Sequence, residues 1–290
     1  MVKLRARMLA TTLAREQTVA STNFDRSTQD VGNMVLLEHV NLKVPDQVIA
    51  TDFYVTGLGF TRDPYMMVGT DNMWVNLGRH QFHLPTGEPQ RFRGIMGIVM
   101  ADLDALLTRL EGIAPRFTNT AFSFARRQDR VDVTCPWGNR FRVHRSIAGF
   151  GDSRGIAYLD SPVPPGAVKT IAEFYSSCMG APSQLSTGAR GGAFTKICVG
   201  PGQRLVYRES KQANTPYDGH HIAVYVADFS GPYAWLSRRD LVSSEDNEHQ
   251  YRFETLVGPR GRKAVWQLEH EIRSLHHPLW QRSLVNREAT

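Results

Sequence analysis

A histidine with the chemistry of a metal ligand lies in the strand-like segment 37–44, LEHVNLKV. The segment alternates with period two, which is typical of a half-buried strand. Leu37, His39 and Asn41 fall on one predicted face, and Val40 on the other. Imidazole binds Zn, Ni and Fe. The pattern therefore predicts a strand that presents His39 away from its apolar stripe.

Two further histidines fall on polar faces of strand-like segments. His83 shares its predicted face with Gln81, while Phe82 points the other way. His221 begins the segment HIAVYV and opposes its apolar residues, beginning with Ile222. A single strand histidine is more often a surface or hydrogen-bonded residue than a ligand, because imidazole serves several roles. Their positions on polar strand faces alone therefore do not identify a metal site.

Carboxylates also fall on the polar face of a strand-like segment near the end of the chain. In the segment WQLEHEIRS, Gln267, Glu269 and Glu271 share one predicted face, opposite Leu268. Carboxylate oxygen is a second common metal ligand. The preceding glycine-containing loop, 258–263, leaves the register of the strand open, so the alternation alone does not choose among these three residues.

The elements that would position these residues form an internal repeat. Segments 37–44 and 155–163 are similar, and each precedes a helix that ends in Phe-Tyr. Segments 94–110 and 221–236 repeat a strand, an acidic helix cap at Asp102 or Asp228, and a helix. Sheet-like sequence follows each of the four openings. Repeats of this kind predict the fold, here an α+β protein with four βαβββ units.

The chain of 290 residues is long enough for two domains that each bury a core. We predict an arm at 1–35, a first domain at 36–147, a linker at 148–153, a second domain at 154–273 and a tail at 274–290. The arm starts with basic residues and few acidic ones. This composition is compatible with a disordered or packed arm, which is favoured, or with a targeting peptide.

Composition excludes several function classes. No run of eighteen apolar residues exists, so no membrane span is expected. Three unpatterned cysteines argue against a disulfide framework and for a reducing, cytoplasmic location. The net charge of +6 comes with only small, separated basic clusters, which favour solvated surface or attraction of an anionic substrate over nucleic-acid binding. A monomer or a homodimer is expected.

Strand, helix and three strands, paired within each half of the chain, resembles the vicinal oxygen chelate superfamily of glyoxalases, extradiol dioxygenases and bleomycin resistance proteins. The resemblance covers about residues 36–273. It depends on LEHVNLKV with its downstream FY, on VMADLDALLTRL and HHIAVYVAD, and on the endings CPWGNRFRVH and QLEHEIRS. It implies that two units close into a cup-shaped sheet, with a divalent metal held by the first and last strands of each unit.

The resemblance implies one metal site, made from both halves of the chain. In the glyoxalase arrangement two ligands come from each domain, and the matching residues here are His39, His83, His221 and Glu269. The corresponding places in the second and third units would form an inactive site, lined by Ile95, Arg142, Tyr158 and Tyr207. The metal set suits Fe(II), Mn, Ni or Zn and leaves positions open for a bidentate substrate.

The leading hypothesis is a metal-dependent isomerase, lyase or oxygenase that acts on a small vicinal-oxygen substrate, with Glu269 as the catalytic carboxylate. Four polar residues could bind the substrate: Gln81, Arg142, Arg204 and Tyr207. A variant is an extradiol-like site in the second half that uses Tyr158 or Asp160. The rival hypothesis is a metal-free protein that binds or sequesters a small molecule between aromatic walls, formed by Trp74, Trp137 and Tyr207.

Overall fold

The computed structural model describes residues 25–66, 69–188, 191–213 and 215–287. The chain divides into two units, Met1–Asp30 and Val31–Thr290. The described part of the first unit is the 3-10 helix η1 (Arg26–Gln29), whose N-cap Asp25 accepts a hydrogen bond from the Ser27 amide. The basic start predicted for the arm lies outside the described residues. None of the described helices has the length and apolar character needed to cross a membrane.

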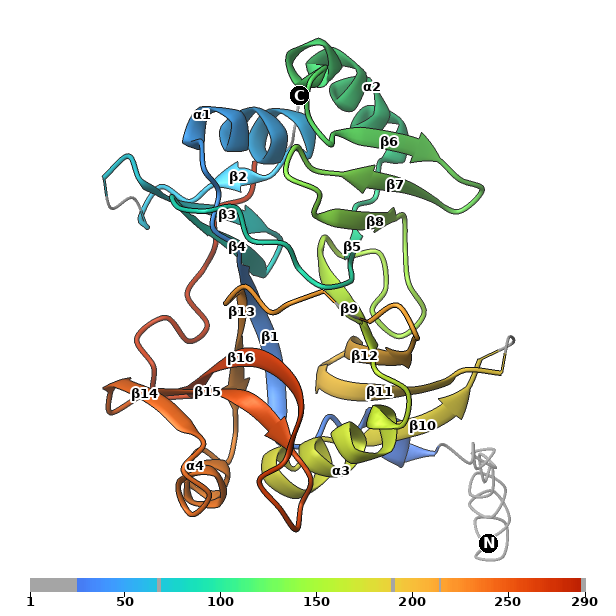
Figure 1. Ribbon diagram of the computed structural model, residues 1–290. Coiled ribbons are helices and arrows are strands. Elements are labelled where there is room, and N and C mark those ends of the chain that lie inside the picture. Colours follow the sequence, from blue (N-terminus) through green and yellow to red (C-terminus); the bar gives the residue numbers. More distant parts are fainter. Residues whose placement is uncertain (1–24, 67–68, 189–190, 214, 288–290) are drawn as a thin grey trace, which may run out of the picture. The chain divides into compact units, whose positions relative to one another are not determined.

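Each of the four predicted repeats is a βαβββ unit, so the predicted α+β class is confirmed (Figure 1). The first unit contains β1 (Met34–Asn41), α1 (Gln47–Ala50), which continues as the π-helix η2 (Thr51–Gly57), β2 (Thr61–Arg62), β3 (Asn72–Leu77) and β4 (His80–Pro85). The second contains β5 (Ile95–Val99), α2 (Leu103–Ile113), the 3-10 helix η3 (Ala114–Phe117), β6 (Ser123–Arg126), β7 (Arg130–Thr134) and β8 (Arg140–His144).

The second half of the chain repeats this order. The third unit contains β9 (Gly155–Val163), α3 (Ala167–Met179), β10 (Ser183–Thr187), β11 (Ala193–Gly200) and β12 (Gln203–Glu209). The fourth contains β13 (His221–Val226), α4 (Ser230–Ser237), β14 (Val242–Asn247), β15 (Gln250–Val257) and β16 (Ala264–Ser274).

Local sequence explains where the helices begin and end. The predicted cap Asp102 accepts hydrogen bonds from the amides of Asp104 and Ala105 at the start of α2, which satisfies two of the amides that a helix leaves unpaired. Helix α3 ends at Met179 and is capped by Gly180, whose φ of 58° is the left-handed conformation that glycine adopts without a Cβ penalty.

The described strands form two eight-stranded sheets. Sheet I has the order β14-β15-β16-β13-β1-β4-β3-β2, and sheet II has the order β10-β11-β12-β9-β5-β8-β7-β6. Sheet I therefore joins the first and fourth units, and sheet II the second and third. Pairing within each half of the chain was the wrong expectation. Each half of the chain contributes strands to both sheets. The predicted domain limits, 36–147 and 154–273, therefore stay a prediction.

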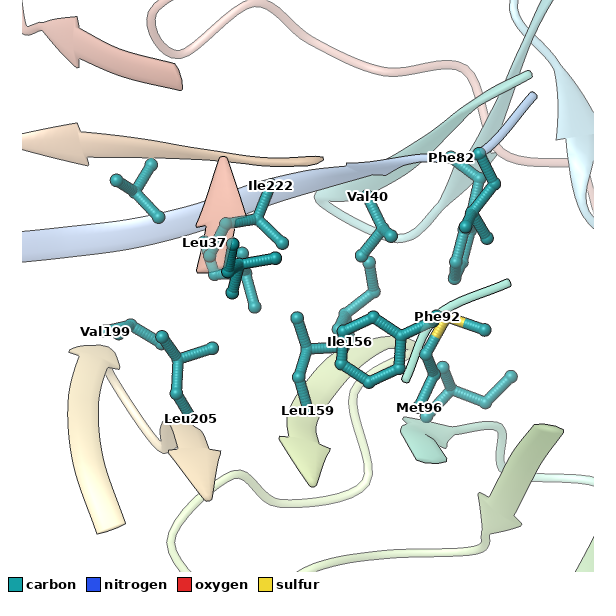
Figure 2. Close-up of a cluster of buried hydrophobic side chains, with 14 of the residues drawn as sticks. Leu37, Val40, Phe82, Phe92, Met96, Ile156, Leu159, Val199, Leu205 and Ile222 are labelled. Carbon is teal, nitrogen blue, oxygen red and sulfur yellow. The ribbon is translucent and has the colours of Figure 1, made fainter. Parts of the chain in front are cut away.

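One face of each sheet is buried against the other sheet. Figure 2 shows Leu37, Val40 and Ile222 of sheet I opposite Ile156 and Leu159 of sheet II. Helix α3 packs on strands of both sheets, namely β10, β11, β12, β15 and β16. The opposite face of sheet I, which carries the polar residues of β1, β13 and β16, is called the first cup. The corresponding face of sheet II is called the second cup.

A β-bulge in β1 changes which residues face the first cup. Leu37 pairs with Val224 and His39 with Ala223, so two residues along β1 match one along β13. Leu37 consequently packs in the core on the same side as Val40 (Figure 2). The expectation that Leu37 shares the face of His39 was wrong, because strict alternation fails at a bulge. The bulge also brings Glu38 beside His39.

Side chains replace the backbone hydrogen bonds that the bulge removes. The Gln203 side chain accepts from the Leu37 amide (3.0 Å) and donates to the carbonyls of Leu37 and Ile156 (2.9 Å each). β9 has a matching irregularity, since Gly97 pairs with Tyr158 and Ile98 with Ile156. There the Ile156 amide donates to Nδ1 of His80 (3.2 Å). Gln203 and His80 each begin the last strand of their unit, so equivalent positions link the two sheets.

Candidate metal site

Three histidines from separate strands meet on the first cup. His39 comes from β1, His83 from β4 and His221 from β13, and one nitrogen of each lies within 4.8 Å of the others. An ion with bonds of about 2.1 Å holds two nitrogens no more than about 4.2 Å apart. Small side-chain adjustments therefore suffice to bring all three nitrogens onto one ion.

Glu38 orients the His39 ring. Its Oε2 lies 3.0 Å from Nδ1 of His39, and because an ionised carboxylate only accepts hydrogen bonds, Nδ1 carries the proton. Nε2 then keeps its lone pair, and it is buried without a hydrogen-bond partner among the described residues. A carboxylate behind a ligand histidine is the usual support of a metal site. The bulge in β1 creates this pair.

His83 is held by an amide oxygen and an indole ring. Its Nε2 donates to Oδ1 of Asn72 (2.6 Å), which leaves Nδ1 without the proton. The ring stacks on Trp74, with centroids 3.9 Å apart and an angle of 12° between the planes. Trp74 also contacts the edge of His39, at 4.9 Å between centroids. Both imidazole rings are therefore held in place by neighbouring side chains.

His221 lies beside the carboxylates of β16. It pairs with Glu269 in the parallel ladder, while Glu271 pairs with Ala223 two residues further on. Nδ1 of His221 is 3.4 Å from Oε1 of Glu269, and Nε2 is 3.6 Å from Oε2 of Glu271. Nε2 of His221 is buried and makes no hydrogen bond to any described residue.

Arg252 and Arg273 neutralise these carboxylates. Arg252 of β15 forms ion pairs with both Glu269 (2.6 Å) and Glu271. Arg273 forms ion pairs with Glu271 and with Glu38. Sequence reasoning missed both arginines and Glu38. The alternation of β16 could have revealed Arg273, which is two residues beyond Glu271, whereas the β15 register that brings Arg252 opposite Glu271 is a tertiary feature.

The three imidazoles are neutral at ordinary pH. Burial is the main cause of a pKa well below the usual value in His39 and His221. Burial, and then the charges of Arg273 and Arg252, lower the pKa of His83 to about 3. Neutral imidazole is the form that binds a metal. Three neutral rings, each with one nitrogen within 4.8 Å of the others, fit a divalent ion.

Asn41 is a further residue that the sequence analysis did not assign. It lies in β1, where it pairs with His221 of β13 on one side and with His83 of β4 on the other. Its side chain is buried, and Oδ1 has no hydrogen-bond partner among the described residues. The signal was present in the sequence, since Asn41 is two residues from His39 on the same predicted face.

The C-terminal segment after β16 covers part of the first cup. In Figure 1 it runs past β4 toward β2. Asn76 donates to the Val285 carbonyl (2.9 Å), and Asn286 bonds both backbone groups of Gly78 (2.8 Å each). A cavity of about 570 Å³ lies beneath the segment, with Glu38, Arg79, Trp280 and Arg282 in its lining. The cavity thus reaches the carboxylate that supports His39.

The residues predicted to bind substrate do not gather at the triad. Gln81 pairs with His39 in sheet I, and its amide donates to Asp63 (2.9 Å) and Asn76 (2.7 Å). The other three belong to sheet II: Arg142 is half exposed, the Arg204 guanidinium binds the Gln203 carbonyl (2.7 Å), and Tyr207 is buried.

Tyr207 does not line a cup. Its hydroxyl contacts that of Tyr175 on α3 at 2.6 Å, so it faces the helix and the core. The expectation that it lines the inactive site was wrong. Leu205 belongs to the buried core (Figure 2), and the alternation of QRLVYRE places Tyr207 on the same face of β12 as Leu205. That signal was available in the sequence.

The second cup lacks the ligand set. Tyr158 takes the place of His39, because it pairs with Gly97 as His39 pairs with Ala223. Ile95 takes the place of His221, since it pairs with Asp160 as His221 pairs with Asn41. Asp160 is engaged by Arg208 (2.8 Å), and the Tyr158 hydroxyl contacts Nε2 of His144 (3.0 Å).

Comparison with known proteins supports the fold. No family model matches the sequence, and no curated protein matches it. The structure is similar to that of glyoxalase I from Zea mays, with a TM-score of 0.57 and 12% identity over 87% of this chain and 95% of that one. A candidate dioxygenase from Bacillus subtilis has a TM-score of 0.50 and 14% identity over 88% and 92%. The chain has the vicinal oxygen chelate fold.

Proposed function

We propose that this protein is a metal-dependent enzyme that acts on a small substrate with two neighbouring oxygen atoms. One observation carries the proposal. His39, His83 and His221 offer nitrogens within 4.8 Å of one another, and Nε2 of His39 and of His221 is buried without a partner among the described residues. Buried polar atoms without partners cost free energy, and a shared divalent ion would remove that cost.

The triad suits Fe(II), Mn, Ni or Zn. A bound ion of this kind polarises a carbonyl or activates a diol or dioxygen. Glu269 is the carboxylate nearest to Nδ1 of His221, and we assign it as the fourth ligand or as the proton acceptor at Oε1. Arg252 must then share or release this carboxylate, because it forms an ion pair with Glu269 at 2.6 Å.

The substrate is proposed to enter from the cavity under the C-terminal segment. Glu38 lines this cavity and contacts His39. Arg79 lines it as well, and it would attract a substrate with a carboxylate or another anionic group. Asn41 Oδ1 is available to accept a hydrogen bond from a substrate hydroxyl. The chemistry is an isomerisation, a lyase reaction or an oxygenation.

The Arg252 bridge favours a second candidate, a metal-free binding protein. Arg252 occupies both carboxylates of β16, so neither is free for an ion in this arrangement. In that case the first cup would hold an organic ligand against Trp74, which is 7% exposed.

Metal analysis of untagged protein separates the two candidates. We expect about one divalent ion per chain, lost together with turnover in His39→Ala and in His221→Ala. His249→Ala is the matched control, because His249 lies at the turn between β14 and β15 and contacts only Glu248 among carboxylates of the described chain (3.3 Å). Protein that binds no added Co(II), Ni(II), Fe(II) or Zn(II), as judged by calorimetry, would favour the metal-free candidate.

A further inference from the structure

A second cavity, of about 410 Å³, lies where the ends of β5 and β8 meet Trp266 of β16. It is separate from the histidine triad, because none of the three histidines lines it. Its described lining contains the arginines Arg91, Arg93 and Arg140 and no aspartate or glutamate. A cavity that is lined by several arginines and by no acidic residue has a positive potential, which favours the binding of an anion.

Arg93 is partly buried and forms no ion pair with a carboxylate of the described residues, although the charges of Asp218 and Glu254 act on it from a greater distance. Its guanidinium stacks on Trp266, 3.8 Å from the ring centroid, and lies 5.0 Å from that of Tyr217. One Nη donates to the Gln267 carbonyl, but Nε is buried and has no partner among the described residues. Burial lowers the pKa of Arg93. An unpaired buried cation costs free energy, and a bound anion would offset that cost.

Arg91 and Arg140 are also available. Both line the cavity, and neither forms an ion pair with a carboxylate of the described residues. Arg91 crosses over Gly138, where a Cβ would come within 3.2 Å of its Nε. A side chain at position 138 would therefore crowd this guanidinium. Ser210 and Thr215 add hydroxyl donors to the lining.

The internal repeat supports the same conclusion independently. In sheet I, Ala223 pairs with Glu271. In sheet II the equivalent Gly97 pairs with Arg142. Arg142 therefore stands where sheet I has Glu271, and Arg140, two residues earlier on the same face, stands where sheet I has Glu269. The last strand of the fourth unit, β16, thus presents carboxylates in sheet I, where we propose a metal ion. The last strand of the second unit, β8, presents guanidinium groups at the same positions in sheet II.

We propose that this cavity binds a small anion that carries a phosphate or several carboxylates. Arg140 and Arg93 would hold the charged group by charge-assisted hydrogen bonds, which are the strongest that arginine forms. The volume leaves room for a small organic portion against Trp266.

The test is calorimetric titration of the full chain with inorganic pyrophosphate and with citrate in low-chloride buffer. The two probes distinguish a phosphate from a polycarboxylate. We expect at least one of them to bind, more weakly as salt is added, and to lose about tenfold or more in affinity in Arg140→Gln and in Arg93→Gln. Circular dichroism and thermal melting confirm that each variant is folded.

Arg142→Gln is the matched control. It removes the same charge from the same face of β8, but Arg142 does not line the cavity. Binding should persist in this variant. The proposal is overturned if neither probe binds the wild-type chain, if Arg140→Gln binds as tightly as the wild type, or if Arg142→Gln weakens binding as much as Arg140→Gln does.

Discussion

Arg282 forms two hydrogen bonds with Asp63, a carboxylate that is completely buried under the C-terminal segment. Nη2 lies 2.6 Å from Oδ2 and Nη1 lies 3.3 Å from Oδ1. Burial alone would raise the pKa of Asp63, but the bonds from Arg282 and from the amides of Tyr65 and Met66 outweigh it, and the pKa is lowered. This pair attaches the segment to the residue that follows β2.

The first prediction concerns this ion pair. Arg282→Gln should release the C-terminal segment, because removing one partner of a buried pair costs about 3 to 5 kcal/mol. Hydrogen exchange at residues 279–287 should become faster, and Asp63→Asn in the same chain should partly restore protection. Arg262→Gln is the control, since its pair with Asp240 is exposed (61% and 79%). Unchanged exchange in Arg282→Gln would show that the pair does not anchor the segment.

The second prediction separates Glu269 from Glu271. Glu269→Gln should weaken metal affinity by at least about 10- to 100-fold, because Glu269 is proposed as the fourth ligand. Glu271→Gln should mainly lower the free energy of unfolding, since Glu271 is 3% exposed and neutralises Arg252 and Arg273. Chelator competition and urea unfolding measure the two quantities. The reverse pattern would move the fourth ligand to Glu271.

The third prediction is a pH dependence of stability from His80. Burial, and then Arg79, lower its pKa from 6.5 to about 4. Between these values the unfolded chain binds a proton that the folded chain does not, so stability falls as pH falls through this window. The contribution is complete above pH 6.5 and lost below about pH 4, and it amounts to about 3 kcal/mol.

His80→Gln should flatten this dependence and preserve the fold. Glutamine occupies the equivalent position in sheet II, where Gln203 accepts from the Leu37 amide as His80 accepts from the Ile156 amide. Urea unfolding of both proteins at several pH values between 4 and 7 measures the difference. Equal slopes for the two proteins would exclude His80 as a source of the pH dependence.

The fourth prediction concerns Gln203. Gln203→Leu keeps a side chain of similar size but leaves the Leu37 amide and the carbonyls of Leu37 and Ile156 without their present partner. Each buried group left unpaired costs about 1 to 3 kcal/mol, so the free energy of unfolding should fall by several kcal/mol. Gln212→Leu, at a surface-exposed position, is the control. A loss below about 1 kcal/mol in Gln203→Leu would mean that water replaces these bonds.

Sequence periodicity was sufficient for the parts of this protein that depend on local geometry. A strand places alternate residues on opposite faces, so the polar faces of His39, His83 and His221 could be predicted, and the repeated strand–helix–strands order could be read directly. The same rule placed Glu269 and Glu271 together on β16. Applied to β12, it would also have placed Tyr207 with Leu205, facing α3.

Tertiary structure decided the features that depend on which strands meet. Repeated units with similar apolar faces can pair in more than one way, and only the packed chain joins the first unit to the fourth. The bulge between Leu37 and His39 is defined by the register against β13, so alternation could not show that Glu38 supports His39. Arg252 reaches the carboxylates from a different strand for the same reason. The sequence pattern within one strand does not show which other strand it pairs with. The free energy that selects the pairing comes from burial of the whole core.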